Sequence, residues 1–294
     1  MKQIGFIGTG GMGSGMAANL LKAGFGVVVN DVRREVTRPL EENGAVFKGS
    51  PREVAEASDV VLSMLPYGAA VRQVALGEGG LSEAAGGART WVDFSSIDKK
   101  TVLDVNGTLG ERGWALLDAS VSGVEEAAAA ATLSIWASGP RPLYDENLAV
   151  FQAMGKKVVY MGELGNAKLV KTANAMFSGI MHMGMVEVYN WLKAGGLNEE
   201  DFENFIRSSQ NYSDALERVT RIIVSGEFKP RKSWMPKDVG FGLDVAREME
   251  IPVPFSSLVY QMFAIAQANG VDGYEATGIA CEVFSILCGR KEAR

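Results

Sequence analysis

QIGFIGTGGMG, residues 3–13, decides the fold of this chain. Its first five residues are mostly apolar, as in a short buried strand, and its glycines then follow the spacing G-x-G-x-x-G. Apolar residues at helical spacing cover residues 12–23, and a β-branched run covers residues 27–30. Strand, glycine turn, helix and strand in this order predict a βαβ unit, the context in which the glycine pattern indicates a dinucleotide site.

The glycines of this turn have separate physical roles. Gly8 permits the tight turn, Gly10 lets the backbone approach a pyrophosphate, and Gly13 lets the helix pack close to the strand. The N-terminus of the helix adds free N–H groups and the positive end of its dipole. We therefore expect the cofactor to bind at Gly8, Gly10, Gly11, Met12 and Gly13.

The second strand ends at Asp31, 18 positions after the last glycine of the turn. A carboxylate there accepts hydrogen bonds from an adenosine ribose and repels a 2′-phosphate, so the predicted cofactor is NAD. Arg33 and Arg34 follow at once and could serve a 2′-phosphate, which leaves NADP as the alternative.

Further apolar runs of strand length alternate with helical or turn-rich segments in the N-terminal half. This alternation predicts an α/β Rossmann domain, with a mostly parallel sheet and helices on both faces. The runs lie at residues 59–65, 91–94, 115–119, 133–137 and 157–160.

Beyond residue 161 the pattern predicts helices alone. The first is long, residues 166–194, and we expect it to join two domains. The predicted organisation is a Rossmann domain at 1–163, an interdomain helix at 164–194 and an all-helical substrate and dimerisation domain at 195–294. The further helices are expected at residues 201–208, 214–224, 237–247, 256–268 and 275–287, with Asn198 and Ser213 as caps of the first two.

The composition excludes several classes of protein. Charged residues make up 22% of the 294, the net charge is −6, and no block of Lys or Arg indicates a nucleic-acid or membrane partner. Cys281 and Cys288 form no disulfide framework and have no partner at metal-ligand spacing, so we expect no metal site and a cytoplasmic location. The first apolar run stops at Gly8, which argues against a signal peptide, and no stretch approaches the ~20 apolar residues of a membrane span.

Residues 8–20 resemble the opening of the β-hydroxyacid dehydrogenases, a family that includes 3-hydroxyisobutyrate dehydrogenase and tartronate semialdehyde reductase. The resemblance covers essentially the whole chain and implies a fold like that of 6-phosphogluconate dehydrogenase. It continues in order through Met64-Leu65-Pro66 beside the cofactor, residues 92–96 (VDFSS) near the nicotinamide, residues 118–123 (DASVSG) at the substrate, residues 165–174 at the catalytic centre, and Lys237-Asp238 near the cofactor.

The resemblance implies the reversible oxidation of a small 3-hydroxy acid, with a nicotinamide cofactor taking the hydride. Lys171 would be the general acid/base, and Asn174 would orient the substrate hydroxyl or the ammonium. Ser122 and the backbone of Gly123 would hold the substrate carboxylate, with Val124 beside them. The cofactor would also contact Leu65, Pro66, Ser96 and Lys237.

Two other titratable side chains of the long helix are given structural roles. We expect Lys168 to lie at the surface of this apolar helix and Lys171 to be the functional lysine. His182, the one histidine, is expected to be a packed or bridging residue rather than a catalyst.

The sequence departs from the family at the substrate loop. Ser120 stands where the usual loop has Pro, and Val124 stands where it has a second Gly, which adds bulk beside the carboxylate site. Residues 125–131 lack the glycines usual there, and Ala175 stands where many relatives have a second Asn. These changes leave the proton chemistry intact and the substrate's side chain open.

Two other functions are carried as alternatives. One is a different reduction on the same scaffold, of an imine or an aldehyde; relatives that reduce imines usually lack the catalytic lysine, so Lys171 argues against it. The other is a nucleotide-binding protein without turnover, against which the set Lys171, Asn174 and Ser122 argues. The long apolar helix and the helical domain after it also predict a homodimer or homotetramer.

Overall fold

A computed structural model describes residues 2–231 and 233–289. The chain forms two compact units, residues 1–171 and 172–294. The division falls inside the long helix α8 (Asn166–Ala194), which begins in the first unit and continues in the second. The finer division into a domain, a linking helix and a second domain stays a prediction.

The first unit contains a sheet with the strand order β3-β2-β1-β4-β5-β6-β7-β8. Neighbouring strands are parallel except β6 and β7, which are antiparallel. The mostly parallel sheet predicted from the sequence is confirmed, and the antiparallel pair adds a feature that the apolar runs did not indicate. The strands are β1 (Gln3–Ile7), β2 (Gly26–Asn30), β3 (Val46–Phe47), β4 (Val60–Ser63), β5 (Thr90–Asp93), β6 (Ala115–Ser122), β7 (Leu133–Ser138) and β8 (Gly155–Tyr160).

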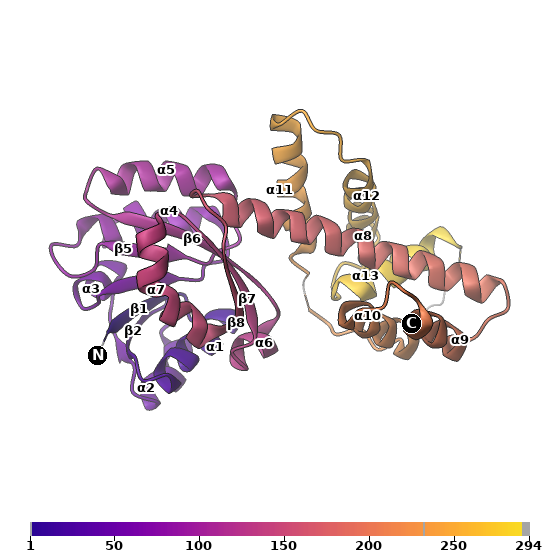
Figure 1. Cartoon of the computed structure of the whole chain (residues 1–294), viewed down its shortest axis with the longest axis horizontal. Coiled ribbons are helices and arrows are strands. Elements are labelled where there is room, and N and C mark those ends of the chain that lie inside the picture. Colours follow the sequence, from indigo (N-terminus) through magenta and orange to yellow (C-terminus); the bar gives the residue numbers. More distant parts are fainter. Residues whose placement is uncertain (1, 232, 290–294) are drawn as a thin grey trace. The chain divides into compact units, whose positions relative to one another are not determined.

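Helices cover both faces of this sheet (Figure 1), because successive strand residues point to opposite sides. In β1, Ile4 and Phe6 pack into one buried cluster, while Ile7 packs into the other. The first cluster includes residues of α1 (Gly11–Lys22), α2 (Arg38–Glu42), α6 (Glu125–Ala129) and α7 (Arg141–Met154). The second includes residues of α3 (Pro51–Glu56), α4 (Gly68–Leu76), α5 (Lys99–Gly110) and the short turn η2 (Leu81–Glu83); a similar turn, η1 (Arg34–Thr37), precedes α2.

Helices α1 and α6 approach each other closely at small residues. A Cβ on Gly15 would lie 2.8 Å from the backbone nitrogen of Ala129, and the Asn19 amide donates a hydrogen bond of 2.7 Å to the Ala128 carbonyl. The space for this contact therefore comes from Gly15 on α1.

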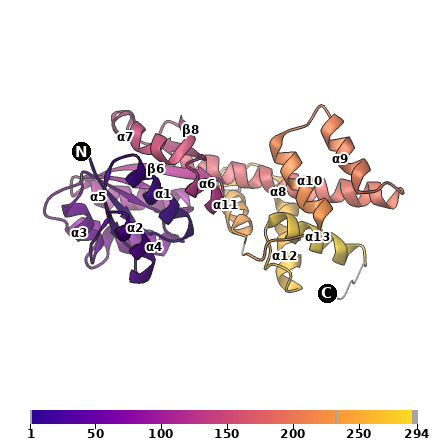
Figure 2. The ribbon, with the colours of Figure 1, turned by 90° about the horizontal axis from the view of Figure 1, so that it is seen from below.

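The second unit is helical, as predicted. Helices α9 (Glu199–Ser208), α10 (Asp214–Ser225), α11 (Met235–Glu248), α12 (Pro254–Ala268) and α13 (Ala276–Leu287) follow the greater part of α8 (Figure 2). Their shared core includes Val186, Phe202, Val219, Phe263 and Val283.

The two predicted helix caps are present, since Asn198 accepts from the N–H of Asp201 in a capping box and Ser213 accepts from that of Leu216. Among the residues that the structure describes, no helix is both long enough and apolar enough to cross a membrane.

Candidate active site

The glycine turn lies between β1 and α1, where the sequence predicts it. Gly8 adopts a φ of +90°, which a side chain would strain, and a Cβ on Gly13 would collide with the Gly8 carbonyl oxygen. Gly10 is the N-cap of α1, and Gly11 and Met12 open the helix. Among the described residues, no side chain caps the N–H groups at the start of α1, and no acidic residue lies in its first turn.

The residues around this turn fit a dinucleotide. A groove of about 560 Å³ runs beside it, with Gly10, Gly11, Ser14 and Arg33 in its lining. The hydroxyl of Thr9 is buried at the turn and has no hydrogen-bond partner among the described residues. An uncapped helix N-terminus, glycines that admit a close approach and a buried hydroxyl still to be satisfied are what a pyrophosphate group requires.

Asp31 is held at the end of β2 by two backbone groups. The N–H groups of Thr9 and Arg33 donate to its two carboxylate oxygens, at 2.8 and 2.9 Å. The guanidinium of Arg33 lies 3.8 Å from the same carboxylate and is 61% exposed. The carboxylate is therefore fixed beside the glycine turn, where the sequence expects a ribose.

Arg34 is engaged by side chains other than Asp31. Its guanidinium forms an ion pair with Glu41, donates to the Thr37 hydroxyl at 2.6 Å and lies 3.9 Å above the Phe47 ring. Of the two arginines that could serve a 2′-phosphate, only Arg33 therefore lines the groove.

The remaining cofactor residues of the first unit follow strand ends. The Leu65 N–H, after β4, donates to the Ser95 hydroxyl at 2.9 Å; Pro66 follows at the surface. Ser96, half-buried, comes three residues after the end of β5. Because β1, β2, β4 and β5 are parallel, Gly8, Asp31, Leu65 and Ser96 lie at one edge of the sheet.

The predicted substrate residues end β6, which runs parallel to β5 toward the same edge. Ser122 is the last residue of the strand and is half-buried. Gly123 has a φ of +139°, and Val124, 41% exposed, precedes α6. Ser120, in the position of the usual Pro, is buried within β6 opposite Trp136.

The predicted catalytic residues lie on α8. Lys171 and Asn174 are both half-buried and are one helical turn apart. Lys171 belongs to the first unit, whereas Asn174 and Lys237 belong to the second. Lys237, on α11, lies 3.8 Å from the carboxylate of Asp238, with the ring of Trp234 at 5.1 Å.

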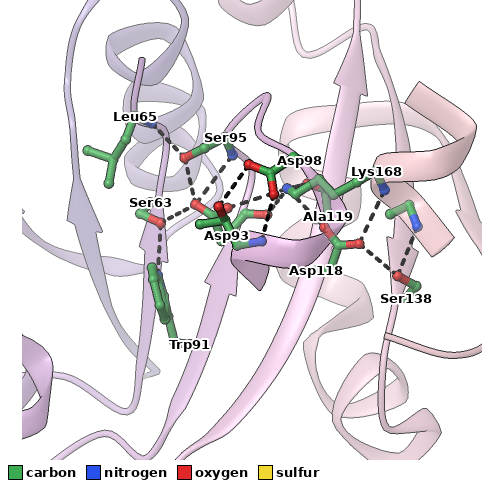
Figure 3. A network of polar contacts seen from close by, with 12 residues as sticks. Ser63, Leu65, Trp91, Asp93, Ser95, Asp98, Asp118, Ala119, Ser138 and Lys168 are labelled. Carbon is green, nitrogen blue, oxygen red and sulfur yellow. Dashed lines mark hydrogen bonds and ion pairs between the residues drawn. The ribbon is translucent and has the colours of Figure 1, made fainter. Parts of the chain in front are cut away.

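Lys168 is buried, and the expectation that it lies at the surface is wrong. Its side chain is 1% exposed and lies between two carboxylates, with Nζ 2.9 Å from Asp118 and 3.4 Å from Asp93 (Figure 3). Nζ also donates to the carbonyls of Asp93 and Ala119, at 3.0 and 2.8 Å. Burial lowers the pKa of Lys168, but the carboxylates of Asp118 and Asp93 outweigh burial and raise it above its usual value.

A signal for this cluster was present in the sequence. Asp93 and Asp118 each stand inside an otherwise apolar strand, in WVDF and LLDA. A carboxylate buried in a sheet requires a cation or several donors, so both residues call for a buried partner. The sequence did not indicate which lysine that partner is.

Comparison with known proteins agrees with the architecture and the site. Residues 3–162 match the family of the NAD-binding domain of 6-phosphogluconate dehydrogenase, and residues 165–280 match the NAD-binding domain of NADP-dependent 3-hydroxyisobutyrate dehydrogenase. The chain belongs to the β-hydroxyacid dehydrogenase family. The resemblance seen in the sequence is thereby confirmed, as is the fold of 6-phosphogluconate dehydrogenase.

Relatives in this family cover nearly the whole chain. The 2-(hydroxymethyl)glutarate dehydrogenase of Eubacterium barkeri is 30% identical over 98% of this chain and 96% of its own length. A Mycobacterium tuberculosis 3-hydroxyisobutyrate dehydrogenase, in a structure with L-serine, is 26% identical with a TM-score of 0.87 over 96% of this chain and 99% of its own.

Not every relative carries the name of an enzyme. The cytokine-like nuclear factor N-PAC of Anopheles gambiae is 28% identical over 94% of this chain, which spans about half, 49%, of that protein's length. The β-hydroxyacid dehydrogenase scaffold therefore also occurs within longer proteins.

His182 takes the packed role that the sequence predicts for it on this scaffold. It is 9% exposed, and its Nδ1 lies 2.9 Å from the hydroxyl of Thr277 on α13. Burial, with a smaller contribution from the charge of Arg218, lowers the pKa of His182 to about 4. The imidazole is therefore neutral near pH 7.

Proposed function

We propose that this protein is an NAD-dependent 3-hydroxyacid dehydrogenase, which transfers a hydride between a nicotinamide cofactor and a small 3-hydroxy acid or the corresponding semialdehyde or keto acid. The observation that carries this proposal is the contrast between two lysines of α8. Lys168 is held between two carboxylates, whereas Lys171, three residues later on the same helix, is half-buried and lies outside that pair of carboxylates.

The proposed chemistry divides among the residues of this chain. When bound, the nicotinamide supplies a hydride acceptor. Lys171, in its amine form, takes the proton of the substrate hydroxyl as the carbonyl forms, and returns it in the reverse direction. Asn174 orients the hydroxyl or the ammonium, while Ser122 and the Gly123 N–H donate to the substrate carboxylate.

The proposed cofactor is NAD, with NADP as the alternative. The fixed carboxylate of Asp31 supports NAD, and the engagement of Arg34 by Glu41 removes one of two cations that could bind a 2′-phosphate. Gly8, Gly10, Gly11, Met12 and Gly13 would hold the pyrophosphate, and Leu65, Pro66, Ser96 and Lys237 would make the remaining contacts. A homo-oligomeric assembly and a cytoplasmic location belong to the same proposal.

The deciding experiment combines a substrate panel with one substitution. NADH or NADPH formation is measured with 3-hydroxy acids of different side chains, and the best substrate is then used for Lys171→Ala. We expect turnover to fall by at least about 10²–10⁴, the usual contribution of a general acid/base. Cofactor binding, measured by fluorescence titration, should stay nearly unchanged because the glycine turn and Asp31 provide it.

Two further variants sharpen this test. Lys171→Arg should also fail, since a guanidinium stays protonated at any useful pH and cannot accept the proton. Lys22→Ala, which removes an exposed lysine from the end of α1, is the control and should keep full activity. A Lys171→Ala enzyme with more than a tenth of wild-type activity would show that the proton has another acceptor. If no hydroxy acid is oxidised, imine or aldehyde reduction and binding without turnover remain to be tested.

A further inference from the structure

We propose that Lys168 is a positioning residue, which holds the first turn of α8, and through it Lys171, in register with the strand ends that carry Leu65, Ser96 and Ser122. The inference rests on the proposed function for what Lys171 does. The contacts among Lys168, Asp93, Asp118 and Ser138 are the evidence that the helix is held in place.

Two hydrogen bonds and two ion pairs hold the Lys168 ammonium. Four oxygens lie around Nζ: the carbonyls of Ala119 at 2.8 Å and Asp93 at 3.0 Å, and carboxylate oxygens of Asp118 at 2.9 Å and Asp93 at 3.4 Å. They come from the ends of β5 and from the middle of β6. One side chain of α8 is therefore bonded to two neighbouring strands at once.

The two carboxylates extend this connection in opposite directions (Figure 3). Asp93 Oδ1 accepts from the hydroxyls of Ser63 at 2.8 Å and Ser95 at 2.6 Å, and the Ser95 hydroxyl accepts in turn from the Leu65 N–H. The ends of β4 and β5 are thereby tied to Lys168.

On the other side, Asp118 is tied to the backbone of α8 itself. Asp118 Oδ2 accepts from the Ser138 hydroxyl at 3.0 Å and from the Lys168 N–H at 3.2 Å. The Ser138 oxygen also accepts from the Ala167 N–H at 3.0 Å. Backbone and side-chain contacts together therefore fix the first turn of α8. The N–H groups of Ala167 and Lys168, which have no partner within the helix, are satisfied by Ser138 and Asp118.

The members of this network stand close in sequence to the proposed site residues. Lys171 lies three residues after Lys168, Ser96 three residues after Asp93, and Ser122 four residues after Asp118 on the same strand. An apolar side chain could fill the same space without the cost of burying charge. The charged network adds directional hydrogen bonds and ion pairs, which fix the rotation and the axial position of the helix that carries Lys171.

The first measurement follows amide hydrogen exchange of residues 166–171 in the full protein. Lys168→Met removes the ammonium, and Ser138→Ala removes one hydroxyl while leaving every charge in place. Leu109→Ala, which opens a cavity under α5 in the other buried cluster, is the control for loss of stability. We expect faster exchange in this segment for the Lys168 and Ser138 variants, at least tenfold for Lys168→Met, and no selective change there for Leu109→Ala. Unchanged exchange in the first two would overturn the proposal.

The second measurement is kcat per folded site, with sites counted by cofactor binding. We expect kcat to fall at least about tenfold for Lys168→Met and about threefold or more for Ser138→Ala, while the cofactor Kd changes less than threefold. Leu109→Ala should keep the wild-type kcat per folded site. A kcat within twofold of wild type in both network variants, or a cofactor Kd that weakens as much as kcat, would show a merely structural network.

These outcomes separate the two proposals. If Lys168→Met does not fold, Ser138→Ala decides both measurements, because it leaves no uncompensated buried charge. If the wild-type protein oxidises no 3-hydroxy acid, the proposed function fails, and hydrogen exchange still decides whether Lys168 holds the helix.

Discussion

At the end of β2, Asp31 is the residue on which cofactor choice should depend. Its carboxylate is fixed by two backbone N–H groups, so it cannot turn away from a 2′-phosphate. We expect the wild-type protein to bind NAD more tightly than NADP, and Asp31→Asn to reduce that preference about tenfold, or about 1.4 kcal/mol. Fluorescence titration with both cofactors measures this ratio.

The two neighbouring arginines provide the matched comparison. Arg33→Gln should weaken NADP binding further, because Arg33 lines the groove, whereas Arg34→Gln should not, because Glu41, Thr37 and the Phe47 ring already engage Arg34. Tighter binding of NADP than of NAD by the wild-type protein would show that Arg33 outweighs Asp31.

Some single residues could be assigned a role from the sequence, and others could not. The glycine turn and Asp31 act over short stretches of chain, so their pattern predicts their structure directly. Lys168 and Lys171 look alike in the sequence, because both stand on an apolar helix. What distinguishes them is Asp93 and Asp118, which lie 75 and 50 positions before Lys168 and meet it only in the folded sheet.

Among the elements, the contact of α1 with α6 depends on the absence of one side chain. A Cβ on Gly15 would lie 2.8 Å from the Ala129 nitrogen, closer than van der Waals contact allows. We expect Gly15→Ala to lower the free energy of unfolding by about 1–3 kcal/mol, the usual cost of overpacking.

A second helical glycine gives the control for this change. Gly107, on α5, has nothing within 4 Å of its Cβ position, so Gly107→Ala should raise stability by about 0.4–1 kcal/mol through helix propensity and chain entropy. Chemical denaturation of both variants measures the two effects. A Gly15→Ala protein as stable as wild type would mean that α6 can move away without cost.

A second prediction at this scale concerns His182, which joins α8 to Thr277 of α13. The folded protein holds the pKa of His182 at about 4, below the ordinary histidine value of 6.5, so between these values only the unfolded chain takes up the proton. The contribution of His182 to the free energy of unfolding is therefore fully present above pH 6.5. It is lost as the pH falls toward 4, by up to about 3 kcal/mol. Denaturation of wild type and His182→Asn from pH 7 to 4 should give converging stability curves; parallel curves would contradict the assignment.

The C-terminal helices and most strands were predictable from the sequence, whereas the shortest elements were not. The periodic pattern gave α8 with its observed bounds of residues 166–194, and the other C-terminal helices to within two residues at each end. The short pieces α2, α3, α6 and β3 carry too few residues for a period to show, and tertiary contact decides them. The antiparallel pairing of β6 with β7 is a matter of topology, which apolar runs do not encode.

For the molecule as a whole, fold and chemistry are separable. Family membership holds over nearly the full chain, while the relatives' names differ, from 2-(hydroxymethyl)glutarate dehydrogenase to a nuclear factor. Two of the residues expected to depart from the family, Ser120 within β6 and Val124 just before α6, flank the proposed carboxylate site at Ser122 and Gly123. Selection among 3-hydroxy acids should therefore depend on that loop rather than on the scaffold that carries it.

The assembly of the whole molecule follows from where its apolar surface lies. In the second unit, Phe177 and Trp191 on α8 are 70% and 74% exposed, and Phe255 and Leu258, three residues apart on α12, are 71% and 61% exposed. Exposed apolar side chains indicate an interface where they gather into a patch, and aromatic residues are enriched at such interfaces. We therefore expect a homodimer or homotetramer built through residues 172–294, visible in sedimentation at micromolar concentration.

Charged substitutions test this assembly without touching a core. Trp191→Glu and the pair Phe255→Glu with Leu258→Glu place carboxylates on the expected interface and should lower the sedimenting mass to that of a smaller assembly or the 31.4 kDa monomer. Leu103→Glu, at a 44% exposed position on α5 in the first unit, is the matched control and should leave the mass unchanged. The exposed positions leave the fold intact, so circular dichroism should match wild type in every variant. A wild-type protein that sediments as a monomer would refute the assembly, and a wild-type mass in both Glu variants would place the interface on other residues of the second unit.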